Sequence, residues 1–334
     1  MKVLVTGAGG YIGRQLVRQL ALQSDVSVNA MIRPGGDDGF LESMGATVFA
    51  ADLATRQDMS APLENVDCVF HLAAGTAGSH YEMMLNTVVA TENLLQECLR
   101  QRLKRFVLVS SLSVYQMTAL NAGACLDETC PVDDNLNARD PYAIVKIRQE
   151  RLVRQRCTEA GLDCVVIRPG KIYGPGDHPI PPQLGLRIPG VCFLFIGGRN
   201  ILPLTHVANC AEAILKGATA PGIEGEEFNI VDDNLPTQRQ FLNLYKSILG
   251  RIPHRIWIPY RGFLLLAFFL ETAARKTKGN IPPVISRYRA ANLWKNFRYS
   301  NEKAKKRLGW TPRIDPREGI KEMLLAAKGE NTPS

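Results

Sequence analysis

The chain has 334 residues, of which 46% are hydrophobic, and its 40 Lys and Arg against 32 Asp and Glu give a net charge of +8. A chain of this length can bury a sizeable core in about two domains. Its eight cysteines are scattered without a Cys-x-x-Cys pair or a His/Cys cluster, so neither a metal site nor a disulfide framework is expected.

The beginning of the chain predicts a strand, a glycine-rich turn and a helix. Residues 2–6 are an apolar, β-branched run typical of a buried strand, and residues 14–22 have helical periodicity. Between them, Gly7, Gly10 and Gly13 have the spacing of a dinucleotide-binding turn. We expect the first glycine to permit the tight turn, the second to let the backbone approach a pyrophosphate, and the third to let helix pack against strand. The helix N-terminus offers N–H groups to the phosphates, so the expected cofactor contacts here are Gly7, Gly10, Tyr11, Ile12 and Gly13.

The second and third predicted strands end in residues that bear on the cofactor. Residues 26–32 form the second strand, and Arg33 follows it where an acidic residue would hold the adenosine ribose of NAD. A guanidinium there can pair with a 2′-phosphate, so NADP is expected, with NAD as the alternative. Residues 47–51 form the third strand, after which Asp52, followed by Leu53, could accept a hydrogen bond from the adenine amino group.

Strands and helices continue to alternate through residue 232. Residues 67–75 predict a fourth buried strand, whose small residues leave room for the cofactor beside Leu72, Ala73 and Ala74. Two helical patterns and two apolar strands follow, at 81–101, 106–109, 141–160 and 164–167. This alternation predicts an α/β chain with a Rossmann-type, doubly wound parallel sheet.

Tyr142 and Lys146 are one helical turn apart, so their side chains project from the same face. A nearby ammonium favours the ionised phenol, which predicts a lowered pKa for Tyr142. A tyrosine of that kind can pass a proton to and from a substrate oxygen. The pair therefore predicts acid–base chemistry.

The alternating pattern also suggests how the chain divides. We expect an NAD(P)-binding Rossmann domain over residues 1–175, with 205–232 returning to it. Residues 176–204 are rich in Pro and Gly and predict substrate-binding loops. Together with residues 233–334 they form a smaller, mostly helical substrate lobe in this prediction.

Positive charge is concentrated near the C-terminus. Residues 251–334 hold 18 Lys and Arg and 6 Asp and Glu, a balance of +12, which leaves −4 for residues 1–250. A basic region of this kind suits nucleic acid, an anionic membrane or an acidic substrate. No recognition module accompanies the charge, so no nucleic-acid partner is expected.

Residues 262–270 are nine consecutive residues without a charge, and basic residues flank them on both sides. As a helix they span roughly 14 Å, about half of a bilayer core, so they cannot cross a membrane. They could lie at an interface, with peripheral contact through 255–278 at the inner face of a membrane. A buried helix, or a lid over an apolar pocket, is the favoured interpretation.

Together these motifs resemble the extended short-chain dehydrogenase/reductase family, in its epimerase/dehydratase and 3-beta-hydroxysteroid dehydrogenase-like branch. They follow the order and spacing of that family to about residue 235. The motifs are Thr6-Gly7-Ala8-Gly9-Gly10-Tyr11-Ile12-Gly13, Asp52-Leu53, His71-Leu72-Ala73-Ala74, Val109-Ser110-Ser111-Leu112-Ser113-Val114-Tyr115, Tyr142-Ala143-Ile144-Val145-Lys146 and Arg168-Pro169-Gly170-Lys171-Ile172-Tyr173-Gly174-Pro175-Gly176. The resemblance implies a Rossmann fold and an NAD(P)-dependent enzyme.

The resemblance also implies roles for individual residues. Tyr142 would be the catalytic acid/base, and Lys146 would bind the nicotinamide ribose and lower the tyrosine pKa. Ser111 would hydrogen-bond the reacting carbonyl or hydroxyl, with Ser110 and Ser113 as rivals for that role.

Two further residues are implied near the cofactor. Pro169 would pass close to the nicotinamide. Asn86 matches an asparagine of the family's sugar epimerases, although the more common asparagine lies one place later, where this chain has Thr87.

The expected activity is that of an NADP(H)-dependent oxidoreductase that interconverts a hydroxyl and a ketone on a small, apolar or cyclic substrate. Sugar-nucleotide members of the family usually carry asparagine where this chain has Lys171. A nucleotide-sugar epimerase or dehydratase stays an alternative, because Lys171 could hold a diphosphate and residues 308–312 resemble the tail of sugar-modifying members. A non-catalytic cofactor-binding sensor is the third possibility.

The expected location and assembly follow from simpler features. The first residues lead directly into a strand, which leaves no room for a secretory signal. Reduced thiols and this start predict a cytoplasmic chain. A homodimer is left open.

Overall fold

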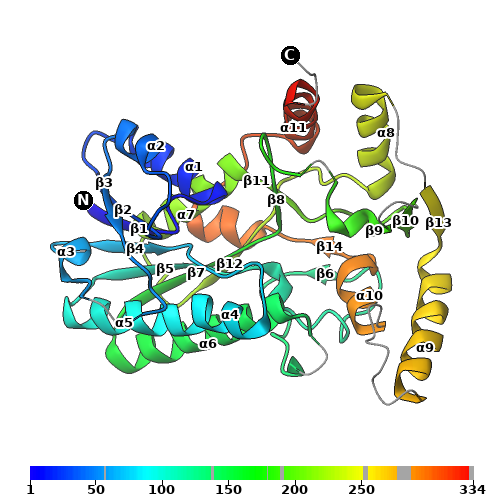
Figure 1. The fold of residues 1–334 in the computed structure, drawn as a ribbon, viewed down its shortest axis with the longest axis horizontal. Helices are drawn as coiled ribbons and strands as arrows, with labels where there is room; N and C mark the ends of the chain where they lie inside the picture. The colour runs from blue at the N-terminus through cyan, green and yellow to red at the C-terminus, as the bar shows by residue number, and fades with distance from the viewer. Residues whose placement is uncertain are drawn as a thin grey trace.

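The central sheet of the computed structural model has seven parallel strands in the order β12-β7-β5-β4-β1-β2-β3 (Figure 1). The structure describes residues 1–55, 58–136, 139–178, 180–188, 192–250, 255–276 and 287–330. The strands of the sheet are β1 (Lys2–Thr6), β2 (Ser27–Ile32), β3 (Thr47–Ala50), β4 (Cys68–His71), β5 (Arg105–Val109), β7 (Asp163–Pro169) and β12 (Glu227–Ile230). The order reverses between β1 and β4, so the predicted doubly wound sheet is confirmed.

Helices cover both faces of this sheet, as Figure 1 shows. On one face lie α1 (Tyr11–Leu20), α2 (Gly39–Ser43) and α7 (Val207–Thr219). On the other lie α3 (Ser60–Leu63), α4 (His80–Met84), α5 (Ala90–Arg100) and α6 (Pro141–Ala160), with a π-helical turn, η1 (Leu85–Val89), between α4 and α5. The apolar strands are continuous hydrophobic runs because helices cover both faces of the sheet.

Local signals set the ends of α6, the helix that carries the tyrosine–lysine pair. Asp140 is its N-cap, and the Asp140 carboxylate accepts a hydrogen bond from the Ala143 N–H at 3.0 Å. Pro141 occupies the first turn, where its missing N–H costs nothing. Gly161 ends the helix with a φ of 65°, in the left-handed region.

The remaining strands and helices lie mostly beyond the carboxyl edge of the sheet. Short strands pair as β8 (Lys171–Tyr173) with β11 (Leu204–His206) and β6 (Cys125–Leu126) with β14 (Arg298–Tyr299). A separate three-stranded sheet has the order β13 (Arg255–Ile258), β10 (Cys192–Ile196) and β9 (Gly185–Ile188). The longer helices here are α8 (Gln238–Leu249), α9 (Tyr260–Lys276), α10 (Arg287–Trp294) and α11 (Pro316–Glu330), and the short ones are η2 (Leu112–Val114), η4 (Pro182–Leu184) and η5 (Ala304–Leu308).

Two predictions for this part of the chain need correction. Residues 176–204 were expected to be loops, yet β9 and β10 form an antiparallel pair there, because the apolar run of β10 finds partners on both edges. The 262–270 stretch was expected to be buried or to act as a lid. In the structure only Phe263 and Ala267 of that stretch are fully buried, because α9 packs along one side only.

The chain returns to the central sheet near its C-terminus. Ala304, Leu308 and Trp310 are buried in the same apolar cluster as α1 and α7. The Trp310 indole N–H donates to the Asn209 carbonyl oxygen at 2.9 Å. Within the described ranges, no helix is both long and apolar enough to traverse a bilayer.

Candidate active site

The glycine-rich turn between β1 and α1 is closed on one side and open on the other. Gly7 has a φ of 68°, and a Cβ there would lie 2.9 Å from the Ala73 nitrogen. A Cβ on Gly13 would overlap the Gly7 carbonyl oxygen, so α1 can approach β1 closely only with glycine at this position. On the open side, Gly10 and Tyr11 are exposed.

The N-terminus of α1 fits the pyrophosphate of a dinucleotide. Gly10 is the N-cap and has no side chain to satisfy the first N–H groups of the helix. These donors and the helix dipole favour an anion. The N–H groups of Tyr11 and Ile12 would therefore hold the phosphates. The Gly10 N–H donates to the Gly7 carbonyl oxygen at 3.0 Å, so Gly10 would contribute by having no side chain in the way. The Tyr11 hydroxyl donates to the Pro175 carbonyl oxygen at 3.0 Å and connects this turn to the segment after β8.

The other predicted cofactor residues follow the carboxyl ends of neighbouring strands. The last residue of β1, Thr6, lies in register with Met31 of β2 and His71 of β4. Ile32 of β2 is in turn in register with Ala50 of β3. The structure thus brings Arg33, Asp52, Leu53, Leu72, Ala73 and Ala74 to one edge of the sheet.

The exposure of these residues differs. Arg33 is exposed, and its side chain has no hydrogen bond or ion pair with the described part of the chain. Asp52 is half-buried, and its carboxylate accepts from the Ala54 N–H at 3.0 Å. Leu53 is buried and packs in the core below. Arg33 is therefore free to meet a ligand, whereas Leu53 serves packing.

Asn86 and Thr87 occupy different environments in η1. Asn86 is half-buried, and its Cβ lies near Gly75, after β4. Thr87 is fully buried, and its hydroxyl accepts from the Gly75 N–H at 2.9 Å. The threonine thus fixes the loop after β4, and Asn86 is the neighbour left with partial exposure.

Tyr142 lies in the first turn of α6, opposite the end of β5. Its hydroxyl lies close enough to the Ser111 side chain for that serine to affect the pKa of the phenol. Burial raises the pKa of Tyr142 above its usual value of about 10, and Asp140 adds to this, while the Ser111 contact opposes it. The structure therefore brings Ser111 and Tyr142 together, as the motifs predicted, with the phenol in its protonated form near neutral pH.

The two rival serines point elsewhere. The Ser110 hydroxyl donates to the Glu150 carboxylate at 2.8 Å. The Ser113 hydroxyl is buried without a hydrogen-bond partner among the described residues. Ser111 is the one whose side chain meets Tyr142, and it also accepts from the Ser113 N–H at 3.1 Å.

Lys146 is only 3% exposed and is held by two acceptors. Its Nζ donates to the Val109 carbonyl oxygen at 2.8 Å and to Gln149 Oε1 at 3.0 Å. Burial lowers the pKa of Lys146 to about 8, although Glu150 opposes the shift. The prediction that Lys146 lowers the pKa of Tyr142 is wrong for this arrangement, because the ammonium is directed at Val109 and Gln149 and burial dominates at the phenol.

A buried chain of polar side chains leads from the end of β1 to Lys146. His71 lies between two hydroxyls, with Nδ1 2.7 Å from Thr6 Oγ1 and Nε2 2.8 Å from Thr91 Oγ1. The Gln149 amide donates to the same Thr91 hydroxyl at 2.9 Å, and its oxygen accepts from Lys146. These five residues are each 3% exposed or less, so water does not compete for their hydrogen bonds.

The proton positions in this chain follow from which atoms can accept. The Thr91 hydroxyl donates to the Thr87 carbonyl oxygen at 2.5 Å, so Thr91 Oγ1 must accept from both Gln149 and His71. His71 Nε2 therefore carries the ring proton, and Nδ1 accepts from the Thr6 hydroxyl. His71 is thus neutral, in agreement with burial and the nearby Lys146, which lower its pKa to about 3.

Sequence reasoning missed His71, Thr91 and Gln149 as members of the site. No motif marks the latter two, and 58 residues separate them along the chain. Gln149 could have been suspected, because it lies three residues after Lys146 and so shares its helix face.

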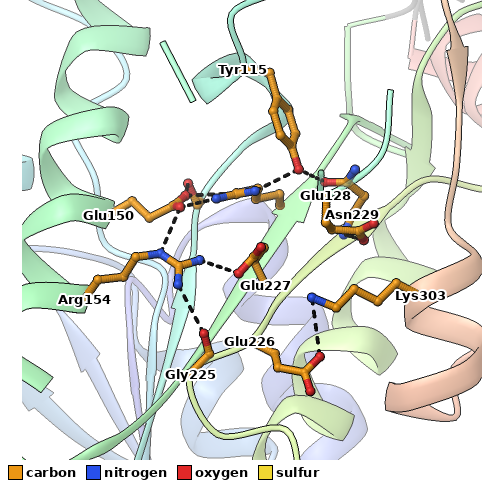
Figure 2. Close-up of polar contacts among 11 residues, drawn as sticks. Tyr115, Glu128, Glu150, Arg154, Gly225, Glu226, Glu227, Asn229 and Lys303 are labelled. Atoms are coloured by element: carbon orange, nitrogen blue, oxygen red, sulfur yellow. Dashed lines mark hydrogen bonds and ion pairs between the residues drawn. The ribbon is translucent and has the colours of Figure 1, made fainter. Parts of the chain in front are cut away.

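A buried ion pair holds α6 against the strands (Figure 2). The Glu150 carboxylate accepts from Ser110 and from Arg168 Nε, the latter at 3.1 Å, and both charged side chains are 3% exposed. Arg168 also donates to the Tyr115 hydroxyl at 2.8 Å, and Tyr115 donates to Asn229 on β12 at 2.8 Å. Because loss of one partner of a buried pair costs about 3–5 kcal/mol, this network fixes the position of α6 and of the serines after β5.

Beyond β7, the chain continues past the carboxyl edge of the sheet through residues predicted to lie near the cofactor or substrate. Pro169 ends β7, is buried and lies in register with Ile230 of β12. The Gly170 N–H donates to the Thr205 hydroxyl at 3.0 Å. Lys171 is half-buried and forms an ion pair with Asp177 at 2.9 Å.

This geometry agrees with a comparison of the chain with protein families. Residues 3–230 match the model of the NAD dependent epimerase/dehydratase family. The chain belongs to this family. The resemblance to extended short-chain dehydrogenases/reductases is thereby confirmed, and the protein is an NAD(P)-dependent enzyme of that class.

Relatives of nearly the same length include enzymes that act on quite different molecules. The chain is 29% identical to the 2-alkyl-3-oxoalkanoate reductase of Stenotrophomonas maltophilia, over 98% of this chain and 99% of that protein. It is 27% identical to the decarboxylating sterol-4-alpha-carboxylate 3-dehydrogenase of Mus musculus, over 97% of this chain and 90% of the relative. Among solved structures, the UDP-glucuronic acid 4-epimerase of Bacillus cereus in complex with NAD has a TM-score of 0.75 at 21% identity, covering 99% of this chain and all of that one.

Proposed function

We propose that this enzyme interconverts a hydroxyl and a ketone on a small, apolar or cyclic substrate, with NADP(H) as its cofactor. The observation that carries the proposal is the Ser111–Tyr142 contact at the carboxyl edge of the sheet. Two hydroxyls that converge there can hold one substrate oxygen, which is the requirement for protonating a carbonyl or deprotonating an alcohol.

The cofactor and three side chains would each have a separate role in this reaction. When bound, the nicotinamide supplies or accepts the hydride at the substrate carbon. Tyr142 gives its hydroxyl proton to the carbonyl oxygen during reduction, or takes the alcohol proton during oxidation, while Ser111 donates a hydrogen bond to the same oxygen. Because burial raises the pKa of Tyr142, the phenol keeps its proton near neutral pH, which favours ketone reduction. Lys146 uses two of its three N–H groups internally and has one left for the nicotinamide ribose.

The nature of the substrate is supported by Lys171 and by the relatives. The Lys171 ammonium is paired with Asp177, which offsets its charge and weakens the case for a diphosphate ligand. The two curated relatives described above are named for reactions on oxoalkanoates and sterols, which are largely apolar. Residues 308–312, which resembled the tail of sugar-modifying members, have a packing role here, since Trp310 is buried in the core.

A nucleotide-sugar epimerase is the second candidate, and the fold shared with the UDP-glucuronic acid 4-epimerase favours it. An assay can separate the two. We expect ketone-dependent oxidation of NADPH with 2-alkyl-3-oxo acids or cyclic ketones, and Tyr142→Phe should lower that rate about 10²-fold or more while NADPH affinity stays the same. Conversion of UDP-sugars without net NADPH oxidation would support the epimerase and overturn the reductase.

Arg33 provides the test of cofactor choice. Charge-assisted hydrogen bonds to the 2′-phosphate are each worth about 1.5–3 kcal/mol, so Arg33→Ala should weaken NADPH binding about tenfold or more and leave NADH binding unchanged. Arg100→Ala is a matched control, because Arg100 is exposed on α5, outside the site. Equal losses for both cofactors, measured by fluorescence titration, would show that Arg33 does not select NADP.

A further inference from the structure

The outer side of the substrate lobe carries an exposed apolar surface formed by β13 and α9. Thirteen large apolar side chains are exposed among the described residues, and seven of them lie between residues 256 and 270. They are Ile256, Trp257, Leu265, Leu266, Phe268, Phe269 and Leu270, which we call the outer apolar face. Figure 1 shows β13 and α9 at the end of the molecule farthest from the seven-stranded sheet.

The packing of α9 shows that this face points away from the part of the chain against which the helix packs. The opposite side of the helix is the packed one, where Phe263 and Ala267 are fully buried. The Phe263 ring lies 5.0 Å from the Trp294 ring of α10, between centroids. A lid would turn its apolar side toward the substrate, so the lid interpretation does not fit this orientation.

The exposed tryptophan has its polar atom satisfied from within. Trp257 is 59% exposed, yet its indole N–H donates to the Gly197 carbonyl oxygen at 2.7 Å. What Trp257 offers to the outside is therefore apolar ring surface. Leu265 and Phe269, which are 63% and 66% exposed, extend that surface one helical turn apart along α9.

The sequence segment that contains the outer apolar face is strongly basic. Residues 255–298 contain nine Lys and Arg and a single acid, Glu271, so this segment carries a net +8. Not all of these cations lie on the face, since Lys295 and Arg298 donate to the Leu120 and Gly123 carbonyl oxygens. The whole chain also has a net charge of +8, which means that the remaining residues are balanced. Glu271 is itself paired with Arg287 at 2.8 Å, and Arg261 is exposed at the start of α9.

We propose that the outer apolar face rests on an anionic phospholipid membrane, with α9 in the plane of the interface. An apolar stripe beside concentrated cations is the combination that such a surface selects, because apolar side chains enter the acyl boundary while cations meet the headgroups. Exposed tryptophan and phenylalanine suit the same boundary. α9, at 17 residues with a charged end, lies on the membrane and does not cross it.

The same charge disfavours a second copy as the partner. A two-fold symmetric contact places each residue of the face against the corresponding face of the other chain. Two basic segments would then meet, and like charges across an interface cost several kcal/mol. An anionic surface has no such cost, and attraction to it weakens as salt rises.

The test uses the full chain and sedimentation with two kinds of vesicle, phosphatidylcholine alone and phosphatidylcholine with an equal part of phosphatidylglycerol. We expect binding to the anionic vesicles only, with release at high salt. The double variant Leu265→Ser, Phe269→Ser should reduce binding about tenfold or more. Leu22→Ser is the matched control, because Leu22 is 84% exposed near α1 and should leave binding unchanged.

Three results would overturn the proposal. The first is equal binding to both kinds of vesicle, or none to either. The second is a concentration-dependent dimer, seen by sedimentation velocity, that the double variant abolishes. The third is a raised KM for the ketone substrate in the double variant without any change in vesicle binding. Circular dichroism and cofactor binding of the variants establish that they are folded, and the salt dependence of the wild-type chain tests the proposal without any variant.

Discussion

Two apolar stretches of this chain differ in their exposure to solvent: one is buried and the other is largely exposed. Strand β5 contains Phe106, Val107, Leu108 and Val109, all of them buried. Helix α9 contains a stretch just as apolar, yet five of the six residues from 265 to 270 are exposed. Composition alone does not distinguish the two.

The difference lies in how many neighbours cover each element. β5 pairs with β4 and β7, and its alternate side chains enter two clusters, Val107 and Val109 on one face of the sheet and Phe106 and Leu108 on the other. α9 is covered on one side, by the cluster around Phe263. An apolar run is therefore buried only to the extent that tertiary neighbours surround it, and an uncovered side of this size marks a contact surface.

The largest expected effect comes from one substitution made in both stretches. Phe106→Ala removes a fully buried ring and should lower the free energy of unfolding by about 3–5 kcal/mol. Phe269→Ala removes a side chain that is 66% exposed and should change the free energy of unfolding by about 0.5 kcal/mol or less. Urea unfolding of both variants measures the two values, and similar losses would show that α9 is packed in solution.

The glycine-rich turn allows the same comparison between two neighbouring positions. A Cβ at Gly13 overlaps the Gly7 carbonyl oxygen, so Gly13→Ala should lower stability by about 1–3 kcal/mol through overpacking. A Cβ at Gly10 meets only that oxygen, at 3.2 Å, on the open side of the turn. Gly10→Ala should therefore leave thermal unfolding nearly unchanged and weaken cofactor binding about tenfold. The reverse pattern, with stability lost at Gly10 and kept at Gly13, would contradict the packing described here.

The smallest expected effect is on the pH dependence of cofactor binding and concerns the buried ammonium of Lys146. Its pKa is about 8, so the ammonium is charged below that pH and cofactor affinity should fall as the pH rises through about 8. Gln149→Leu removes an acceptor of the ammonium, which lowers the pKa of Lys146 further and should move that fall to lower pH. Titration of NADPH fluorescence against pH measures the shift, with Gln155→Leu, an exposed position of α6, as the control. An unchanged pH profile would show that Gln149 does not position Lys146.

Much of the fold could be predicted because its signals are local. The strand β1, the glycine turn and α1 follow each other within twenty residues, and the spacing of Gly7, Gly10 and Gly13 expresses the close packing of that unit. Strands β9 and β10 were missed because their pairing joins segments rich in Pro and Gly, whose local preference is for loops. The strand character there comes from partners across the small sheet.

The sequence by itself determined the turn that suits a pyrophosphate, the convergence of residues at the carboxyl edge and the shared helix face of Tyr142 and Lys146. Each depends on spacings of three or four residues or on strands that are parallel, so local geometry suffices. Only the tertiary structure decided where the Lys146 ammonium points, which serine meets Tyr142 and which side of α9 stays uncovered. These depend on burial and on contacts such as that between Gln149 and Thr91, 58 residues apart, and the free energy of a charge or a ring is set by what surrounds it rather than by its neighbours in the chain.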